Sequence, residues 1–573
     1  MKKVASATRL FSILDVKQFM GNCLCLCVWV VFMVQPKSVL TMSKMNPIEL
    51  SLFSSRVSAI CDEMGIVLRR TAFSPNIKDR LDFSCALFGP AGELFAQAAH
   101  IPVHLGSMAF AMGSIVEAVD WQPGDLLAVN DPYLGGTHLP DVTLVSPVFF
   151  QVQEGSEETA KLIGFIANRA HHANIGCDTP GSMPLSSTLE EEGVVIPPTL
   201  IVRRGKLMPG ASLLPGIGKT LSGDFAAQAG ANQVGVERLT ELVNKIGDFS
   251  YQAAMEQLND YADRITESVL ATLKPGRSIF SDTLDDDGKG SKNIKLEVSL
   301  NICDSSVELD FTGCSDQVPG NLNCPEAVAA AASYYCFRCL MPADVPACAG
   351  LFRRITLITR KGSIVNANRP AAVAAGNVET STRLVDLVFG ALAVILPERI
   401  PAASQGTMNN VAMGHINANT GERWDYYETI GGGMGGGPNF SGLHGVHSHM
   451  TNTLNTPIES LEMNYPLRIH RYEKRKGSAG VGQNPGGEGV VRQYEFLRPA
   501  ELSLLTERRL KGPWGLAGGG DGAVGVNLLN GETIPAKCNL SVAAGDLLTL
   551  MTPGAGGWGK RESAASDDTK EPS

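Results

Sequence analysis

The stretch NDPYLGGTHLPD, residues 130–141, lies between two short apolar runs, Leu126–Val129 and Val142–Phe150, which have the character of β-strands. A third run, Leu162–Ala167, is followed by NRAHHANIG at residues 168–176. Apolar runs bounded by Gly, Pro, Asp and Asn are typical of strands joined by loops. This region is therefore predicted to contain strands whose connecting loops carry imidazole and carboxylate side chains.

Imidazole and carboxylate groups together suit zinc, iron or manganese. His138 and Asp141 are three residues apart on a segment too rich in Gly and Pro to be helical, so a loop must bring them together. His171 or His172, at the end of a predicted strand, could complete the ligand set. The alternative is that these are structural or surface histidines. Because four of the ten histidines, including His104, fall in this one region, the sequence favours a divalent metal site.

Helices are predicted on both sides of this region. One runs from Pro47 to about Arg70, because Asn46 is a good N-cap and Pro fits the first helical position. Two more, Asp224–Ile246 and Ser250–Leu273, are separated by a glycine.

The second half of the chain begins with a predicted antiparallel hairpin. Ile294–Ile302 and Val307–Phe311 alternate apolar and polar residues on either side of a turn. Helices are expected after Pro325 and over Thr382–Leu396, and beyond about Gly406 the chain is Gly-rich and strand-like.

These elements predict a mixed α/β (α+β) protein that is multi-lobed and β-rich, with several helices and a Gly-rich C-terminal part. A chain of 573 residues is long enough for more than one core. The expected divisions are an N-terminal extension (1–44), a metal-site lobe ending in a helical pair (45–275), a β-hairpin plus helix lobe (276–405), a Gly-rich β-containing lobe (406–560) and a polar tail (561–573).

The N-terminal extension contains an apolar run, Phe19–Val34, that is shorter than the ~20 residues of a spanning helix. The residues after it offer no convincing signal-peptidase site. Since Met42 and Met45 directly precede the predicted helix start, the favoured interpretation is that translation begins there.

Composition narrows the functional class. The formal charge of −10 argues against a general nucleic-acid binder, and we expect a cytoplasmic protein with no membrane partner. Thirteen cysteines are too few for a disulfide scaffold in a chain of this length. Cys336 and Cys339 have CxxC spacing, but no second pair answers them, so packed thiols in a helix are favoured over a zinc ribbon.

Three further patterns bear on function. PGIGKT at residues 215–220 lacks the first glycine of a P-loop, so ATP is expected on another polypeptide. Gly431–Gly437 could cradle an anion, act as a hinge or pass tightly by a neighbouring strand. A second polar cluster is interpreted as a hydrogen-bonded core in preference to a second metal; it comprises Asp425, Glu428, His444, His447 and His449. Without a GxSxG elbow, metal-activated water is the favoured hydrolytic device.

Several long stretches resemble the hydantoinase B/oxoprolinase family from about Met45 to Gly559. They are NPIEL (46–50), NIKDRLDFSCA (76–86), HIPVHLGSM (100–108), residues 130–141 and 168–176, PGSMP (180–184), LEEEG (189–193), GNVETS (376–381), TERR (506–509), GPWGL (512–516) and TPG (552–554).

The resemblance implies a two-part enzyme. An A-type partner binds ATP and phosphorylates the oxygen of a lactam; a B-type chain holds a divalent metal and completes ring opening. This chain is similar to the B part alone, which implies a hetero-oligomer. The family's metal ligands map onto His138, Asp141 and His171, with Asp131 and His172 less securely placed.

Two departures bear on this assignment, because the family pattern usually has Asp where this chain has Asn174 and Gly where it has Cys177. If that Asp is a ligand or a base in relatives, the same function here is in doubt. The remaining candidates are Arg80 and His104 for holding phosphate or a substrate carboxylate, since Arg offers a bidentate fork, and Asp82 as general base.

Two alternatives remain at this point. The chain could be the large subunit of an ATP-dependent ketone carboxylase, which shares the metal region but forms a carbon–carbon bond. It could also be a non-catalytic scaffold for the A-type partner.

Overall fold

The computed structural model describes residues 45–154, 157–214, 221, 223–416 and 423–561. The predicted N-terminal extension, the PGIGKT stretch and residues 562–573 of the tail lie outside them. No helix in the described part of the chain is long and apolar enough to cross a membrane.

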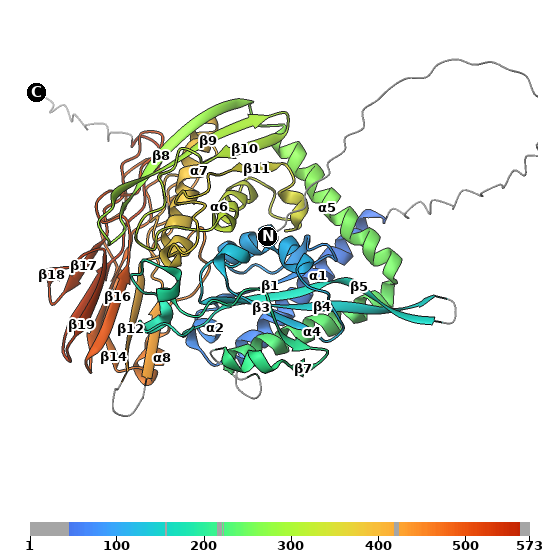
Figure 1. The fold of residues 1–573 in the computed structure, drawn as a ribbon. Helices are drawn as coiled ribbons and strands as arrows, with labels where there is room; N and C mark the ends of the chain where they lie inside the picture. Colours follow the sequence, from blue (N-terminus) through green and yellow to red (C-terminus); the bar gives the residue numbers. More distant parts are fainter. Residues whose placement is uncertain (1–44, 155–156, 215–220, 222, 417–422, 562–573) are drawn as a thin grey trace, which may run out of the picture. The chain divides into compact units, whose positions relative to one another are not determined.

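A seven-stranded antiparallel sheet forms the N-terminal part (Figure 1). In sheet order its strands are β2 (Leu94–Gln97), β1 (Phe83–Phe88), β5 (Glu157–His171), β4 (Asp141–Glu154), β3 (Leu126–Val129), β6 (Thr199–Arg203) and β7 (Lys206–Leu207). The apolar runs of the sequence fall in β1, β3, β4 and β5, so those strand predictions are confirmed.

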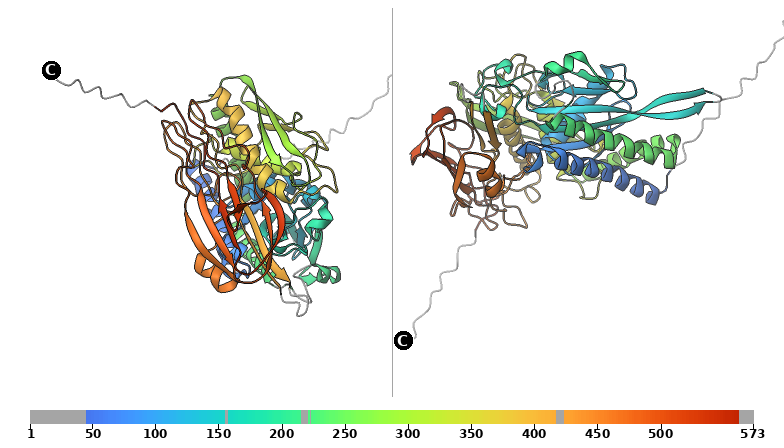
Figure 2. Two further views of the ribbon diagram at one scale, coloured as in Figure 1. Left: turned by 90° about the vertical axis from the view of Figure 1, so that its left-hand side faces the viewer. Right: turned by 90° about the horizontal axis from the view of Figure 1, so that it is seen from below.

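Helices cover both faces of this sheet. They are α1 (Pro47–Thr71), α2 (Pro75–Lys78), α3 (Pro102–Glu117), α4 (Gly223–Ile246) and α5 (Asp248–Leu270). Along β1, Phe83, Cys85 and Leu87 pack with α1 and α4, while Ala86 and Phe88 pack with α3. Because every residue of β1 is buried, the strand has a continuous apolar sequence instead of an alternating one. In Figure 2, α1 and a second long helix run beside the extended β4–β5 hairpin.

The predicted start of α1 is confirmed. The side chain of Asn46 accepts hydrogen bonds from the backbone N–H groups of Ile48 and Glu49, and the side chain of Glu49 accepts one from the backbone N–H of Asn46. Of the apolar residues at helical spacing, Leu52 is an exception, since it is 52% exposed.

The middle of the chain forms a four-stranded sheet in the order β11 (Ile355–Ile358), β10 (Ser306–Asp310), β9 (Lys292–Cys303) and β8 (Gly276–Asp286). The predicted hairpin is β9–β10, and its turn residues Asp304 and Ser305 both have positive φ. Helix α7 (Ser381–Ile395) packs on β8 and β9, and α6 (Glu326–Arg338) lies between α7 and α3. Cys336 is buried in α6 as predicted, whereas Cys339 is exposed at the helix end, because it lies beyond the packed face.

Two sheets form the C-terminal part around one shared core. The first has the order β13 (Arg423–Glu428), β12 (Asn410–Ile416), β16 (Ala500–Leu505) and β19 (Lys537–Val542). The second has the order β14 (Leu467–Lys474), β15 (Val490–Phe496), β20 (Leu547–Met551), β17 (Val526–Leu529) and β18 (Glu532–Thr533), with α8 (Ile458–Asn464) before it. The described structure thus has the mixed α/β class expected, and the lobe boundaries stay a prediction.

The Gly431–Gly437 run passes tightly between other segments. A Cβ at Gly433 would lie 2.2 Å from the carbonyl oxygen of Gly487, and one at Gly435 would lie 1.8 Å from that of Ala402. These contacts favour the tight-passage interpretation of the run, since only glycine fits such close backbone approaches.

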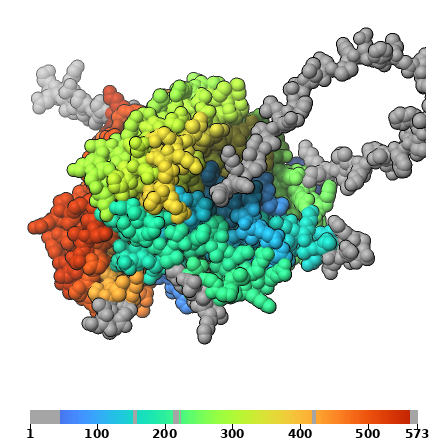
Figure 3. Space-filling model, viewed as in Figure 1, coloured from blue at the N-terminus to red at the C-terminus, as the bar shows by residue number. Residues whose placement is uncertain are grey.

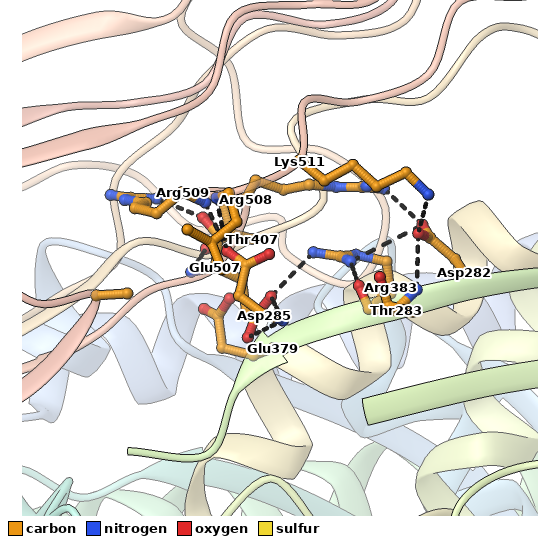
Figure 4. Close-up of polar contacts among 12 residues, drawn as sticks. Asp282, Thr283, Asp285, Glu379, Arg383, Thr407, Glu507, Arg508, Arg509 and Lys511 are labelled. Carbon is orange, nitrogen blue, oxygen red and sulfur yellow. Dashed lines mark hydrogen bonds and ion pairs between the residues drawn. The ribbon is translucent and has the colours of Figure 1, made fainter. Parts of the chain in front are cut away.

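A buried ion network joins the C-terminal sheets to the middle sheet (Figure 4). Glu507, just after β16, accepts from Lys537 at 2.6 Å and from Arg383 of α7 at 3.1 Å, and it also accepts the backbone N–H of Asp285 in β8. Next to it, Arg508 pairs with Asp282 of β8 at 3.0 Å. Because opposite charges contact each other, burial in this network is compensated.

We expect Glu507→Ala to lower the free energy of unfolding by about 3–5 kcal/mol, because it leaves two buried cations without their carboxylate. Lys511→Ala is the matched control, since Lys511 is 57% exposed and its pair with Asp282 is worth less than about 1 kcal/mol. Thermal unfolding of the two variants measures the difference. Equal melting temperatures for both would contradict a clamping role for the network.

Candidate metal centre

Strand register brings the predicted ligands to one edge of the N-terminal sheet. In the β4–β5 pair, Asp141 lies opposite His171, and in the β1–β5 pair Phe83 lies opposite Ala170. The backbone carbonyl of Asp82, directly before β1, accepts the backbone N–H of His171 at 3.1 Å. Asp82, Asp141 and His171 therefore sit at neighbouring strand ends, where side chains are held more rigidly than in loops.

His138, Asp141 and His171 form one buried cluster. One ligand atom from each lies within 4.8 Å of the others, and the residues are 1%, 0% and 2% exposed. Asp141 Oδ1 is 3.1 Å from His138 Nε2 and 3.3 Å from His171 Nδ1. Within the described ranges of the chain, no other group of His, Cys, Asp and Glu meets this geometry.

The hydrogen bonding of His138 favours a cation in this cluster. His138 Nδ1 lies 3.2 Å from the carbonyl oxygen of Ala374, which can only accept, so Nδ1 carries the proton. In the neutral ring Nε2 then presents a lone pair to the carboxylate oxygen of Asp141. Neither His138 Nε2 nor Asp141 Oδ1 has a hydrogen-bond partner. Two buried lone-pair donors at this separation repel each other unless a proton or a cation lies between them.

The charges around the cluster act in the same sense. Burial by itself would raise the pKa of Asp141, but His138 and His104 hold that pKa well below its usual range. Burial would lower the pKa of His138, and the Asp141 carboxylate raises it above the usual value. For His171 burial prevails and its pKa is lowered, so a neutral imidazole is available as a ligand.

The second oxygen of Asp141 is held by three side chains. Thr137 Oγ1 donates to Asp141 Oδ2 at 2.7 Å, Asn377 Nδ2 donates at 3.3 Å, and His104 Nε2 lies 3.2 Å away. His104 is in the first turn of α3, and its ring also lies 3.9 Å from Asp82 Oδ1. Such outer contacts orient a ligating carboxylate.

Arg80 is placed differently from the prediction that it contacts substrate. Its guanidinium is fully buried and donates to the carbonyl oxygen of Tyr427 and to Thr429 Oγ1, at 3.0 and 2.9 Å. The Tyr427 ring in turn stacks on His171, with centroids 4.8 Å apart. Arg80 lies 3.7 Å from Asp82, so it borders the site while two of its N–H groups are already bonded to the C-terminal part.

The structure does not bring His172 and Asp131 into the cluster. His172 follows His171 and points to the opposite face of the sheet, as adjacent residues of an extended chain do. Its Nε2 lies 2.8 Å from Gln228 Oε1 of α4. Asp131 caps its own turn by accepting from the backbone N–H of Tyr133 and pairs with Arg369.

Asn174 also lies apart from the cluster. It is exposed, and its Oδ1 accepts the backbone N–H of Gly176 two residues on. Cys177 is buried with its thiol against the carbonyl oxygen of Glu191. Neither departure from the family pattern removes a residue of the His138–Asp141–His171 cluster.

The second polar cluster of the sequence is divided among separate partners. Glu428 accepts from Tyr494 and Asn455, and His444 Nδ1 accepts the backbone N–H of Glu488. Neither His447 nor His449 lies in a strand, and His449 has a φ of 61°, so the expected alternation does not apply to them.

A cavity of about 20 Å³ lies at the cluster and is lined by Asp82, His104, Asn377, Tyr427 and Thr451 together with the three clustered residues. That volume suits roughly one water-sized species. A cavity of about 950 Å³ shares Thr451 as a wall residue. Its other walls come from α1, α6 and the loops near His100, and in Figure 3 the surface is hollowed where the blue and yellow segments meet.

Sequence reasoning missed Asn377, Thr137 and Tyr427 as neighbours of the cluster. Thr137 stands next to His138, so its proximity was open to prediction from the sequence. Asn377 and Tyr427 are more than 200 residues away from Asp141 along the chain. Only the tertiary fold shows their proximity.

The model of the family described as hydantoinase B/oxoprolinase matches residues 46–561. An uncharacterized protein of Methanocaldococcus jannaschii is 40% identical, over 90% of this chain and 91% of its own length. 5-oxoprolinase 1 of Arabidopsis thaliana is 39% identical over 89% of this chain, but the match spans only 42% of that protein. A Pseudomonas protein that is provisionally named as the B component of a D-/L-hydantoinase is 29% identical over 90% of both chains.

Two solved structures share the fold. The ATP-dependent caprolactamase from Pseudomonas jessenii has a TM-score of 0.81 and 26% identity, over 90% of this chain and 91% of its own. Acetone carboxylase in a nucleotide-free structure has a TM-score of 0.78 over 91% of this chain and 77% of its own. At 17% identity the second likeness concerns the fold alone.

We expect the purified protein to retain about one divalent ion per chain after dialysis, measured by elemental analysis. His138→Ala and Asp141→Ala should each weaken metal binding by at least about tenfold, because each removes a donor atom of the cluster. His172→Ala is the control, since that ring faces α4. Equal metal loss in all three variants would contradict the assigned ligand set.

Proposed function

Because the chain belongs to the hydantoinase B/oxoprolinase family, we propose that it is the metal-holding, ring-opening part of an ATP-dependent cyclic-amide hydrolase. The His138–Asp141–His171 cluster is the observation that carries this proposal. The family match, the relatives named as 5-oxoprolinases and as a hydantoinase component, and the similarity to a caprolactamase all support action on a cyclic amide.

ATP is proposed to be used by an A-type partner. The chain spans less than half of the length of the 5-oxoprolinase relatives, and its sequence holds no complete P-loop pattern. The relative named as the B component of a hydantoinase supports the same division of labour. We therefore propose a hetero-oligomer in which the partner phosphorylates the lactam oxygen. Dependence on ATP agrees with the cytoplasmic location expected above.

Phosphorylation at oxygen would make the amide carbon a good electrophile, which an unactivated lactam is not. A zinc, iron or manganese ion held by His138, Asp141 and His171 would supply a water of lowered pKa, toward ~7, to attack that carbon. Asp82 lines the same cavity and is proposed to accept the proton of the attacking water. His104, between Asp82 and Asp141, is proposed to hold both carboxylates in place.

The surroundings of the cluster are suited to this chemistry. The small cavity excludes bulk water, which would protect a phosphorylated intermediate from side reactions. Thr451 separates it from the large cavity, and we propose that the lactam ring occupies the large cavity during attack.

The test is an assay of this chain together with an ATP-binding A-type partner. ATP hydrolysis should be coupled to ring opening of 5-oxoproline, a hydantoin or caprolactam, and removal of metal by a chelator should abolish the coupling. Phosphate release only with a small ketone plus bicarbonate would instead identify a carboxylase. Full activity of a His138→Ala complex would identify a scaffold.

In the same assay we expect Asp82→Asn to lower kcat by about 10²–10⁴-fold with metal content unchanged, because the amide cannot accept the proton. Asp178→Asn, an exposed carboxylate in the loop after β5, is the matched control and should retain full kcat. A kcat for Asp82→Asn within a few-fold of wild type would remove Asp82 from the proton transfer.

A further inference from the structure

One segment, residues 370–377, backs the metal cluster at two points. The carbonyl oxygen of Ala374 receives His138 Nδ1 at 3.2 Å, and the side chain of Asn377 donates to Asp141 Oδ2 at 3.3 Å. Residues 376–380 are a π-helical turn directly before α7, a geometry that occurs frequently at functional sites. The direction of the Ala374 carbonyl therefore fixes which nitrogen of His138 faces the cluster.

Glu192 holds this segment from behind. Its carboxylate is fully buried, and Oε1 accepts the backbone N–H groups of Val373 and Ala374, both at 2.9 Å, and the hydroxyl of Ser186 at 2.7 Å. Two consecutive backbone N–H groups on one carboxylate oxygen restrict the backbone on both sides of Ala374. A buried carboxylate is costly unless its hydrogen bonds are satisfied, so this arrangement calls for an explanation.

We propose that Glu192 is a positioning residue for the metal centre, which sets the orientation of His138 through the Ala374 carbonyl. The proposal rests on the function proposed above. It assigns the carboxylate a role in metal affinity although Glu192 is no member of the His138–Asp141–His171 cluster. Hydrogen-bond partners of ligating histidines act in this way, since they select the tautomer and limit rotation of the ring.

The alternative is that Glu192 only anchors the loop. Other contacts already do so: the backbone N–H of Leu189 donates to the carbonyl oxygen of Pro370 at 2.8 Å, and Tyr133 Oη donates to that of Ala371 at 2.7 Å. These contacts hold the start of the segment and leave Val373 and Ala374 to Glu192. Loss of the carboxylate should therefore free the Ala374 carbonyl while the loop stays attached.

The experiment compares Glu192→Ala with Glu192→Gln. Affinity for Zn²⁺ and Co²⁺ is measured by competition with a chelator, and the visible spectrum of the Co²⁺-loaded protein reports ligand geometry. We expect Glu192→Ala to weaken binding by about 10–100-fold and to alter the Co²⁺ spectrum. Glu192→Gln should bind within a few-fold of wild type, because its amide oxygen still accepts the same three hydrogen bonds.

Glu190→Ala is the matched control, since this neighbouring carboxylate is exposed to solvent and its loss should leave affinity unchanged. Wild-type affinity and spectrum in Glu192→Ala would overturn the proposal. If that variant fails to fold, Glu192→Asp, one methylene shorter, provides the same comparison, and wild-type affinity in it is equally contrary. Absence of metal binding by the wild type would instead count against the proposed function.

Discussion

A buried carboxylate that faces two imidazole nitrogens is the constraint on which this structure depends. Asp141 is fully buried, and its Oδ1 lies 3.1 Å from His138 and 3.3 Å from His171 without a hydrogen-bond partner. Such a group is costly in a protein interior unless positive charge balances it. A divalent cation bound by the three residues would supply that charge, and the same cation would supply the proposed reaction.

Each layer of the fold contributes to this arrangement. The register of the N-terminal sheet places Asp141 opposite His171, and α3 brings His104 against the second oxygen of Asp141. The middle part supplies Asn377 and the Ala374 carbonyl, and the C-terminal part stacks Tyr427 on His171. The site is thus assembled from segments far apart in the sequence, which explains why the ion network around Glu507 matters for a site that it does not touch.

Local patterns were sufficient to predict the elements and part of the site. Strand ends, the capping box of α1 and the β9–β10 hairpin depend on neighbouring residues, and the structure has them where the sequence indicates. The proximity of His138, Asp141 and His171 followed from two loops flanking adjacent strands. His172 could not be separated from His171 by composition, because only the strand direction decides which ring faces the cluster.

The remaining neighbours lie beyond local patterns. Asn377 reaches Asp141 from 236 residues away, and Glu192 acts through backbone groups 181 and 182 residues away, so no spacing in the sequence indicates either contact. Arg80 shows the converse: a residue type suited to phosphate is used here to hold the carbonyl oxygen of Tyr427.

The most direct measurement is a crystal structure of the purified protein with diffraction data on both sides of the absorption edge of its bound metal. The account predicts one anomalous peak at about 2.0–2.2 Å from His138 Nε2, a ring nitrogen of His171 and an oxygen of Asp141. Density for an ordered cluster with no anomalous peak, or a peak held by other residues, would contradict it.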